Sequence, residues 1–294
     1  GAYTNKTIDL STNEISEVTI EPATEDEINA TVKVMGGEDW RLWIDAMKEA
    51  DVGISVDTAV DIAKESADII LLEKDLMVLE QGVIEGRKTF GNLLKYIKIA
   101  VSSNFGEVIS VMIASLLLPF FPLTPIQLLV QSLLYDLGQL SLPYDNVDKE
   151  YIQKPRKWDM KSIKKFMYYM GPTSSIFDLV VFALLWFAFG IRTAALFQTT
   201  WFCYGIVSTM MGLHVIRSSK RPFLETHASI AVYATTILIS IVTLLIPFTP
   251  LGSIIGLVPI PLIYIVVILG VSFLYCMLAS FVKKIYIKKY GEWL

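Results

Sequence analysis

Apolar and polar positions divide the chain into a polar first part and a second part built of long apolar runs. About 20 apolar residues of helix span the ~30 Å of hydrocarbon in a bilayer, and six runs approach that length. The pattern therefore predicts a mainly α, polytopic membrane protein with a six-helix transmembrane bundle. The predicted spans are Ile99 to Leu118, Pro125 to Leu142, Phe166 to Phe189, Leu196 to Ile216, Ser229 to Phe248 and Pro261 to Val282.

Residues 48–75 predict a small α/β unit, because a strand, a crossover helix and a second strand make a parallel pair. A long helix then begins after the capping residue Asp75, and no strong breaker follows before the first span. Residues 76–98 are therefore predicted as a stalk continuous with the transmembrane domain, residues 99–294. The elements expected in the α/β unit are a strand at Asp51 to Val56, a helix at Asp57 to Ser66 and a strand at Ile69 to Leu72.

Residues 1–47 are expected to form an acidic cytoplasmic segment of uncertain structure. They carry ten acidic and three basic side chains, a balance of −7, whereas the whole chain has −4. Weak alternation around Val18 to Ile20 favours a short strand, and Thr24 to Glu27 resembles a helix-capping box. Chemistry is not evident in this segment.

Composition excludes an ordinary soluble protein, since 53% of the residues are hydrophobic and the mean hydropathy is +0.53. Both cysteines, Cys203 and Cys276, fall inside predicted spans, so neither is predicted to form a disulfide or to bind zinc. We expect membrane lipid to surround the protein and expect no nucleic-acid partner.

Loop charges predict the orientation, because cytoplasmic loops carry an excess of Lys and Arg. The short loops on one side contain only Arg192. Both termini are therefore predicted to be cytoplasmic. The basic side carries Lys149, Lys154, Arg156, Lys157, Lys161, Lys164, Lys165, Arg217, Lys220, Arg221, Lys283, Lys284, Lys288 and Lys289.

Oxygen ligands interrupt the first two spans. Asn104 and Glu107 are three residues apart and share a helix face, and Asp136 follows Ser132 by one turn in the next span. An ionised side chain at mid-membrane costs roughly 2.5 to 3.5 kcal/mol on insertion scales. An ion or proton path would account for this cost. The alternative is that the acids are protonated or hydrogen-bonded as contacts between helices.

Two weaker candidates lie nearby. Asp178 in the third span is close to Thr173, Ser174 and Ser175. Its position is equally compatible with hydrogen bonding to these hydroxyls and with a role in an ion site. Gly138 and Gln139 follow Asp136, and unwinding there would offer backbone carbonyls to an ion. Pro172 predicts a kink in the third span.

Several segments of the chain resemble P-type cation ATPases, and more specifically their bacterial magnesium-transporting branch. The similarity runs from about Asp45 to Leu294. The segments that carry it are Ala50 to Val56 and Asp61 to Leu72, which resemble the end of the phosphorylation domain; Ser102 to Glu107 and Tyr135-Asp136, which resemble the ion-site helices; and Leu140 to Pro143, Lys154 to Asp159 and Gly171 to Asp178, which are typical of the magnesium branch.

The resemblance implies active transport of Mg²⁺ across a bacterial inner membrane, driven by ATP through an aspartyl phosphate. Asn104, Glu107 and Asp136 match the family's cation-site positions, with Ser132 beside them. The chemistry is coherent, because Mg²⁺ favours carboxylate and amide oxygens and keeps several waters. Ca²⁺ or a proton remains possible from the residues alone.

Several family features do not occur in this sequence. The Asp-Lys-Thr-Gly-Thr segment, the Thr-Gly-Glu loop and an intact Gly-Asp-Gly-x-Asn-Asp hinge motif are not found. Asp45 is at best a remnant of that hinge, so no catalytic residue is assigned. We therefore expect that this chain alone does not hydrolyse ATP. It is expected to work with the remaining pump domains, or alternatively as a catalytically inactive membrane subunit or pseudo-pump remnant that binds a partner.

Overall fold

The computed structural model describes residues 3–9, 14–20, 46–73, 75–291 and 293. The chain divides into two compact units, Gly1–Gly82 and Val83–Leu294, and each is described by itself. The helix expected at Thr24 to Glu27 and the hinge remnant Asp45 lie outside the described residues.

The first unit contains two small strand pairs. Strands β1 (Tyr3–Asp9) and β2 (Glu14–Ile20) pair antiparallel, and β2 includes the short strand predicted around Val18. Strands β3 (Ile54–Val56) and β4 (Ile69–Leu71) pair in parallel, with α3 (Asp61–Glu65) between them in sequence. The predicted parallel unit is confirmed.

The elements of this parallel unit are shorter than predicted. A turn follows β3, in which the Ala59 amide donates to the Val56 carbonyl at 2.9 Å, so the helix begins only at Asp61. Gly53 precedes the strand and is tied to the start of β4, because its amide donates to Oδ2 of Asp68 at 2.8 Å.

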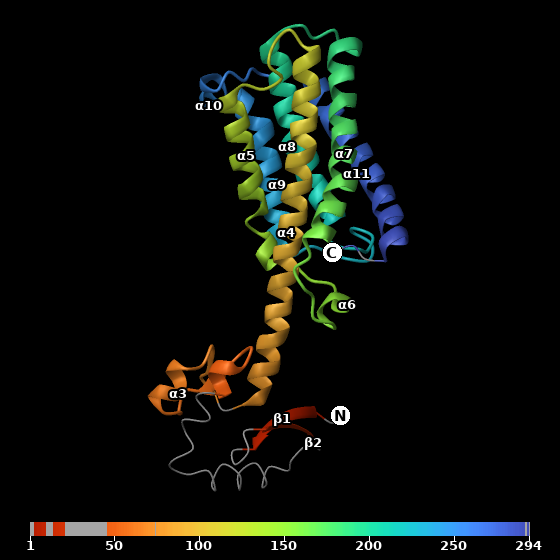
Figure 1. Cartoon of the computed structure of the whole chain (residues 1–294). Coiled ribbons are helices and arrows are strands. Elements are labelled where there is room, and N and C mark those ends of the chain that lie inside the picture. The colour runs from red at the N-terminus through yellow and green to blue at the C-terminus, as the bar shows by residue number, and fades with distance from the viewer. Residues whose placement is uncertain (1–2, 10–13, 21–45, 74, 292, 294) are drawn as a thin grey trace. The chain divides into compact units, whose positions relative to one another are not determined.

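The predicted continuity of stalk and first span is confirmed by α4, a single helix of 42 residues. Oδ1 of Asp75 accepts a hydrogen bond from the Met77 amide at 2.8 Å, as expected of a capping residue. Figure 1 shows α4 running into a bundle that also contains α5, α7, α8, α9 and α11. The helices, with the 3₁₀ turns η1 and η3 and the π-helical turn η2, are α4 (Leu76–Leu117), α5 (Pro125–Gln139), η1 (Leu142–Tyr144), α6 (Lys149–Ile152), α7 (Met160–Ala183), η2 (Leu184–Ala188), α8 (Ala194–Ile216), α9 (Ile230–Leu245), η3 (Ile246–Phe248), α10 (Pro250–Ile254) and α11 (Leu262–Tyr290).

The chain is a mainly α, multi-pass membrane protein. Among the described residues, four stretches are long and apolar enough to cross a membrane: Met77–Leu117, Met160–Ala188, Ile230–Phe248 and Leu262–Tyr290. Six spans were predicted, and the two that are not among these four correspond to α5 and α8. Helix α5 has only 15 residues, or about 22 Å at 1.5 Å per residue. Helix α8 is long enough, but its Thr, Ser, Gln and Gly residues lower its hydropathy.

The end of α5 corrects a second expectation. The span predicted to reach Leu142 ends at Gln139, and a 3₁₀ turn containing Pro143 follows. The carbonyls near this end already have partners, since the Asp136 carbonyl accepts from the Leu140 amide at 3.1 Å and the Gly138 carbonyl accepts from Ser141 Oγ at 3.4 Å. Because α5 is helical through Gln139, the unwinding expected beside Asp136 is not observed.

Helix α8 lies among the other helices and is almost fully buried, with contacts to α5, α7, α9 and α11. Small residues allow close approach between helices. A Cβ added at Gly106 of α4 would collide with Ser174 Oγ and lie 2.7 Å from the Gly171 carbonyl oxygen of α7. A Cβ at Gly205 of α8 would lie 2.6 Å from Nε2 of Gln131.

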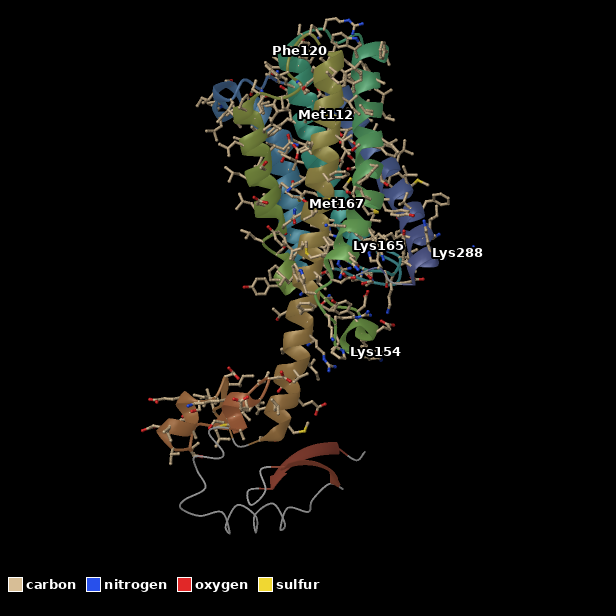
Figure 2. The ribbon with its side chains drawn as sticks, in the orientation of Figure 1. Met112, Phe120, Lys154, Lys165, Met167 and Lys288 are labelled. Carbon is tan, nitrogen blue, oxygen red and sulfur yellow. The ribbon has the colours of Figure 1, made fainter. Side chains whose placement is uncertain are left out.

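Figure 2 shows where the labelled side chains lie in the bundle: Lys154, Lys165 and Lys288 are near one end, and Phe120 is at the opposite end. We call the end with these lysines the basic end. It carries the loop after α5, the loop after α8 and the end of α11.

A buried ion-pair network ties the helices together at the basic end. Oδ2 of Asp145 accepts from Nζ of Lys95 at 3.0 Å and from Nε of Arg217 at 2.8 Å, and its Oδ1 accepts from the Ser229 amide at 3.1 Å. Burial alone would raise the pKa of the Asp145 carboxyl. The hydrogen bond from Arg217 and the charges of Lys95 and Arg217 outweigh burial, so this pKa lies below its usual value.

Candidate functional site

A cavity of about 60 Å³ lies between the helices of the second unit. A water molecule needs roughly 10 to 15 Å³ of such space, so the cavity has room for a few waters. Among the described residues that line it, two are carboxylic acids and none is Lys, Arg or His. The lining residues are Ser103, Asn104, Glu107, Ser110, Val111, Leu123, Gln131, Ser132, Tyr135, Ser174, Asp178, Trp201, Tyr204, Gly205, Ile206, Ser208, Thr209 and Tyr275.

Four of the predicted site residues line this cavity. Asn104 and Glu107 come from α4, Ser132 from α5 and Asp178 from α7. Three helices thus bring together side-chain oxygens from distant parts of the sequence, and the two furthest apart, those of Asn104 and Asp178, are separated by 74 residues.

Asp136 and Gln139 are not among the residues that line the cavity. Asp136 lies on the exposed face of α5, and Asn104 and Ser132 are also largely exposed. Gln139 is fully buried at the end of α5. The cavity therefore opens toward a face of the bundle that carries polar side chains.

Asp178 has a partner on another helix. Oγ of Ser110 on α4 donates to Oδ2 of Asp178 at 2.5 Å. The sequence was compatible with hydrogen bonds to Asp178 from Thr173, Ser174 or Ser175, but these hydroxyls donate to backbone carbonyls instead. Asp178 is therefore held in the cavity by a contact between α4 and α7.

Sequence reasoning missed several lining residues. Ser103, Ser110 and the hydroxyl-bearing residues of α8, Tyr204, Ser208 and Thr209, all reach the cavity. Polar side chains at 131 and 135 were a usable signal, because residues four apart share one face of a helix. Oε1 of Gln131 and the hydroxyl of Tyr135 are buried and lack a hydrogen-bond partner among the described residues.

The donor set is suited to a hard cation. Carboxylate, amide and hydroxyl oxygens are the ligands that Mg²⁺ and Ca²⁺ prefer, and two acids without a basic neighbour attract positive charge in a low-dielectric interior. In the described part of the chain, no three His, Cys, Asp or Glu side chains converge.

Comparison with known proteins reveals two similarities. Residues 120–285 match the family described as "Cation transporting ATPase, C-terminus". The chain is 53% identical over 251 residues to the magnesium-transporting ATPase, P-type 1, of Salmonella typhimurium strain LT2, and 49% identical over 249 residues to the protein of that name from Escherichia coli K12. Each match covers 84% of this chain, and the chain spans only 28% of the length of these relatives.

The second similarity concerns the start of the chain. Residues 1–61 match the family described as "Trans-2-enoyl-CoA reductase catalytic region". Fifty residues are 66% identical to the trans-2-enoyl-CoA reductase [NADH] of Clostridium perfringens, over 17% of this chain and 13% of that protein. Asp45 falls within the matched range, so this first segment is similar to a family different from the one matched by residues 120–285.

Proposed function

Because the chain belongs to the cation-transporting ATPase family defined by its C-terminal region, we propose that it forms the transport part of a pump that moves Mg²⁺ across a bacterial inner membrane. The relatives named above are magnesium-transporting ATPases, and this supports Mg²⁺ as the transported ion. Energy would come from ATP, bound by domains of the complete pump.

The observation that carries the proposal is the cavity lined by Asn104, Glu107, Ser132 and Asp178. Glu107 and Asp178 supply negative charge, and Asn104 and Ser132 supply neutral oxygens. Mg²⁺ dehydrates reluctantly and is usually held by one or two carboxylates with several waters. The cavity offers both the carboxylates and space for water.

Asp136 enters the proposal through its position on the exposed face of α5. A carboxylate facing lipid is costly, so this face needs a polar cover. We infer that the remaining membrane helices of the pump cover Asn104, Ser132 and Asp136 and complete the ion site. Gln139 lies deeper, toward the basic end.

The orientation follows from the basic end, which carries Lys154, Lys165 and Lys288 (Figure 2). Cytoplasmic loops are enriched in Lys and Arg, so we place this end, and both chain termini, in the cytoplasm. Lipid then contacts the outer faces of the bundle.

A second candidate is favoured by the same exposed polar face. A partner subunit in place of further pump helices would cover Asn104, Ser132 and Asp136 equally well, and the chain would then act as a catalytically inactive membrane subunit. Purification from the native membrane separates the two: a pump takes up phosphate from ATP in an acid-stable form, and an inactive subunit co-purifies with its partner and takes up none.

The test of the ion site is Mg²⁺ titration of the complete pump in detergent, because further membrane helices are inferred to complete the site. Glu107→Gln is expected to weaken binding by roughly tenfold or more, because 1.4 kcal/mol of lost attraction corresponds to a factor of ten. Glu85→Gln is the matched control, since Glu85 is an exposed residue of the same helix, paired with Lys88. Unchanged Mg²⁺ binding in Glu107→Gln would remove this residue from the site. Asp136→Asn, placed in the complete pump, is expected to reduce Mg²⁺ transport and Mg²⁺-stimulated ATP hydrolysis.

A further inference from the structure

One face of α5 carries a polar side chain at every fourth position. Gln127, Gln131, Tyr135 and Gln139 are all buried, with exposed fractions of 0%, 8%, 8% and 1%. Residues four apart lie above one another on a helix, so these side chains form one stripe, about 18 Å long at 1.5 Å per residue. We call this stripe the α5 ladder.

The two ends of the ladder differ in their hydrogen bonding. Gln127 is fully engaged: its Oε1 accepts from the Thr124 amide at 2.9 Å, and its Nε2 donates to the Ile255 carbonyl at 3.1 Å. This contact ties the start of α5 to the chain just after α10. The ladder is therefore closed at the end remote from the basic loops.

The other three rungs have buried polar atoms with no hydrogen-bond partner among the described residues. These atoms are Oε1 of Gln131, the hydroxyl of Tyr135, and both Nε2 and Oε1 of Gln139. Ser103 and Gln139 lie within reach of weak hydrogen bonds to the Tyr135 hydroxyl, although none of these contacts has the geometry of a full hydrogen bond. Polar atoms in a membrane interior need partners, and bound water is able to supply those that the neighbouring side chains leave open.

The three side chains with unpartnered atoms extend from the cavity in one direction along α5. Gln131 and Tyr135 line the cavity, and Gln139 is the last residue of α5, next to the turn that leads to the basic end. The groups thus extend from the cavity toward the basic end and not toward Gln127.

We propose that Gln131, Tyr135 and Gln139 hold a file of water molecules that connects the cavity to the basic end of the bundle. Mg²⁺ keeps several of its waters when a protein binds it and must lose and regain the remaining ones as it enters and leaves the site. A role for the file in this exchange of water rests on the proposed function. The file itself depends only on the polar atoms of α5.

Hydroxyl-radical labelling of the full chain in lipid nanodiscs, read out by mass spectrometry, tests the file. Radicals produced by X-rays from bound water modify tyrosines beside that water. Tyr144, which is 76% exposed, serves as the reference for full labelling. Tyr286, which is 0% exposed, packs on Phe166 and Trp293 and lies outside the ladder, gives the baseline for a buried tyrosine.

Tyr135 is expected to be labelled well above Tyr286. Gln139→Met keeps the side-chain volume but removes both polar atoms, and we expect a several-fold loss of labelling at Tyr135, with Tyr144 unchanged. Ser272→Ala is the matched control, because Ser272 of α11 is fully buried, has an unpartnered hydroxyl and lies outside the ladder. This variant is expected to leave labelling of Tyr135 unchanged.

Two results would overturn the proposal. One is labelling of Tyr135 at the level of Tyr286. The other is a Gln139→Met variant that melts at a higher temperature with labelling of Tyr135 unaltered, since removing unpartnered polar atoms from a dry site stabilises a protein. Mg²⁺ titration of the complete pump separates the two proposals: a labelled Tyr135 in a pump that binds no Mg²⁺ rejects the proposed function and retains the file, and Mg²⁺ binding by a pump with an unlabelled Tyr135 does the reverse.

Discussion

Nε of Arg217 at the end of α8 donates to Oδ2 of Asp145 in the loop after α5 at 2.8 Å, with both side chains at most 2% exposed. The same oxygen accepts from Lys95 of α4. One carboxylate therefore holds together two helices and two loops that are far apart in sequence. Nδ2 of Asn92 adds a hydrogen bond to the Asp145 carbonyl at 2.9 Å.

Asp145→Ala is expected to destabilise the protein strongly. The substitution leaves the cations of Lys95 and Arg217 buried without their partner, and breaking a buried pair in this way typically costs about 3 to 5 kcal/mol. Thermal unfolding in detergent measures the loss. Glu150→Ala is the control, because its ion pair with Lys220 is solvent-exposed and exposed pairs contribute little. Equal melting temperatures for the Asp145→Ala variant and the native chain would show that the network is not structural.

The same network predicts a pH dependence. The pKa of Asp145 in the folded protein lies below its usual value of 3.8, so the ionised form contributes stability that is fully present above 3.8 and is lost as the pH falls through the folded pKa. The stability difference between the native chain and Asp145→Asn is therefore expected to be constant from neutral pH to about 4 and to shrink below it. A difference that grows on acidification would contradict the assigned sign.

Gly106 is expected to tolerate no side chain. A Cβ there would meet Ser174 Oγ and the Gly171 carbonyl of α7, so Gly106→Ala would force α4 away from α7, at a cost of about 1 to 3 kcal/mol for overpacking. Because Glu107 and Asp178 flank this contact, Mg²⁺ affinity is expected to fall as well. Gly270→Ala on α11 is the control, since nothing lies within 4 Å of its added Cβ. Similar melting temperatures for the two variants would be evidence against close packing of α4 on α7.

Lys283 is expected to be the most important lysine of α11 for stability. Its Nζ donates to the carbonyls of Val215 at 2.8 Å, Ser218 at 3.1 Å and Lys220 at 2.8 Å. Lys283 thus supplies hydrogen bonds to backbone carbonyls in the last turn of α8 and just after it. Lys283→Met leaves these acceptors without their donor, and we expect a loss of about 1 to 3 kcal/mol. Lys284→Met, on the exposed side of the same turn, should melt like the native chain. Matching losses in both variants would indicate a general charge effect.

Local pattern predicted what depends on local sequence. The apolar runs located the long helices, Asp75 marked the start of α4, and the alternation of strand, helix and strand gave the parallel pair β3 and β4. Asn104, Glu107, Ser132 and Asp178 stood out because acids, amides and hydroxyls are conspicuous within apolar runs, and the cavity brings these four together.

Contacts between helices were beyond the reach of the sequence. Ser110 was not predicted as the partner of Asp178, because the two are 68 residues apart and meet only through the packing of α4 on α7. Asp145 was not singled out, since nothing in its neighbours indicates that Lys95 and Arg217 converge on it. The early end of α5 depends on a 3₁₀ turn whose formation the apolar pattern does not reveal.

Helix α8 combines a moderate hydropathy with nearly complete burial, since 17 of its 23 residues are shielded by other helices. On its own, this segment would partition less readily into lipid than α9 or α11, each of which contains a stretch long and apolar enough to span. During biosynthesis α8 is therefore expected to remain near the insertion machinery until α9 and α11 emerge, and to enter the bilayer together with them. The order in which the ribosome delivers α8, α9 and α11 thus becomes part of the folding pathway.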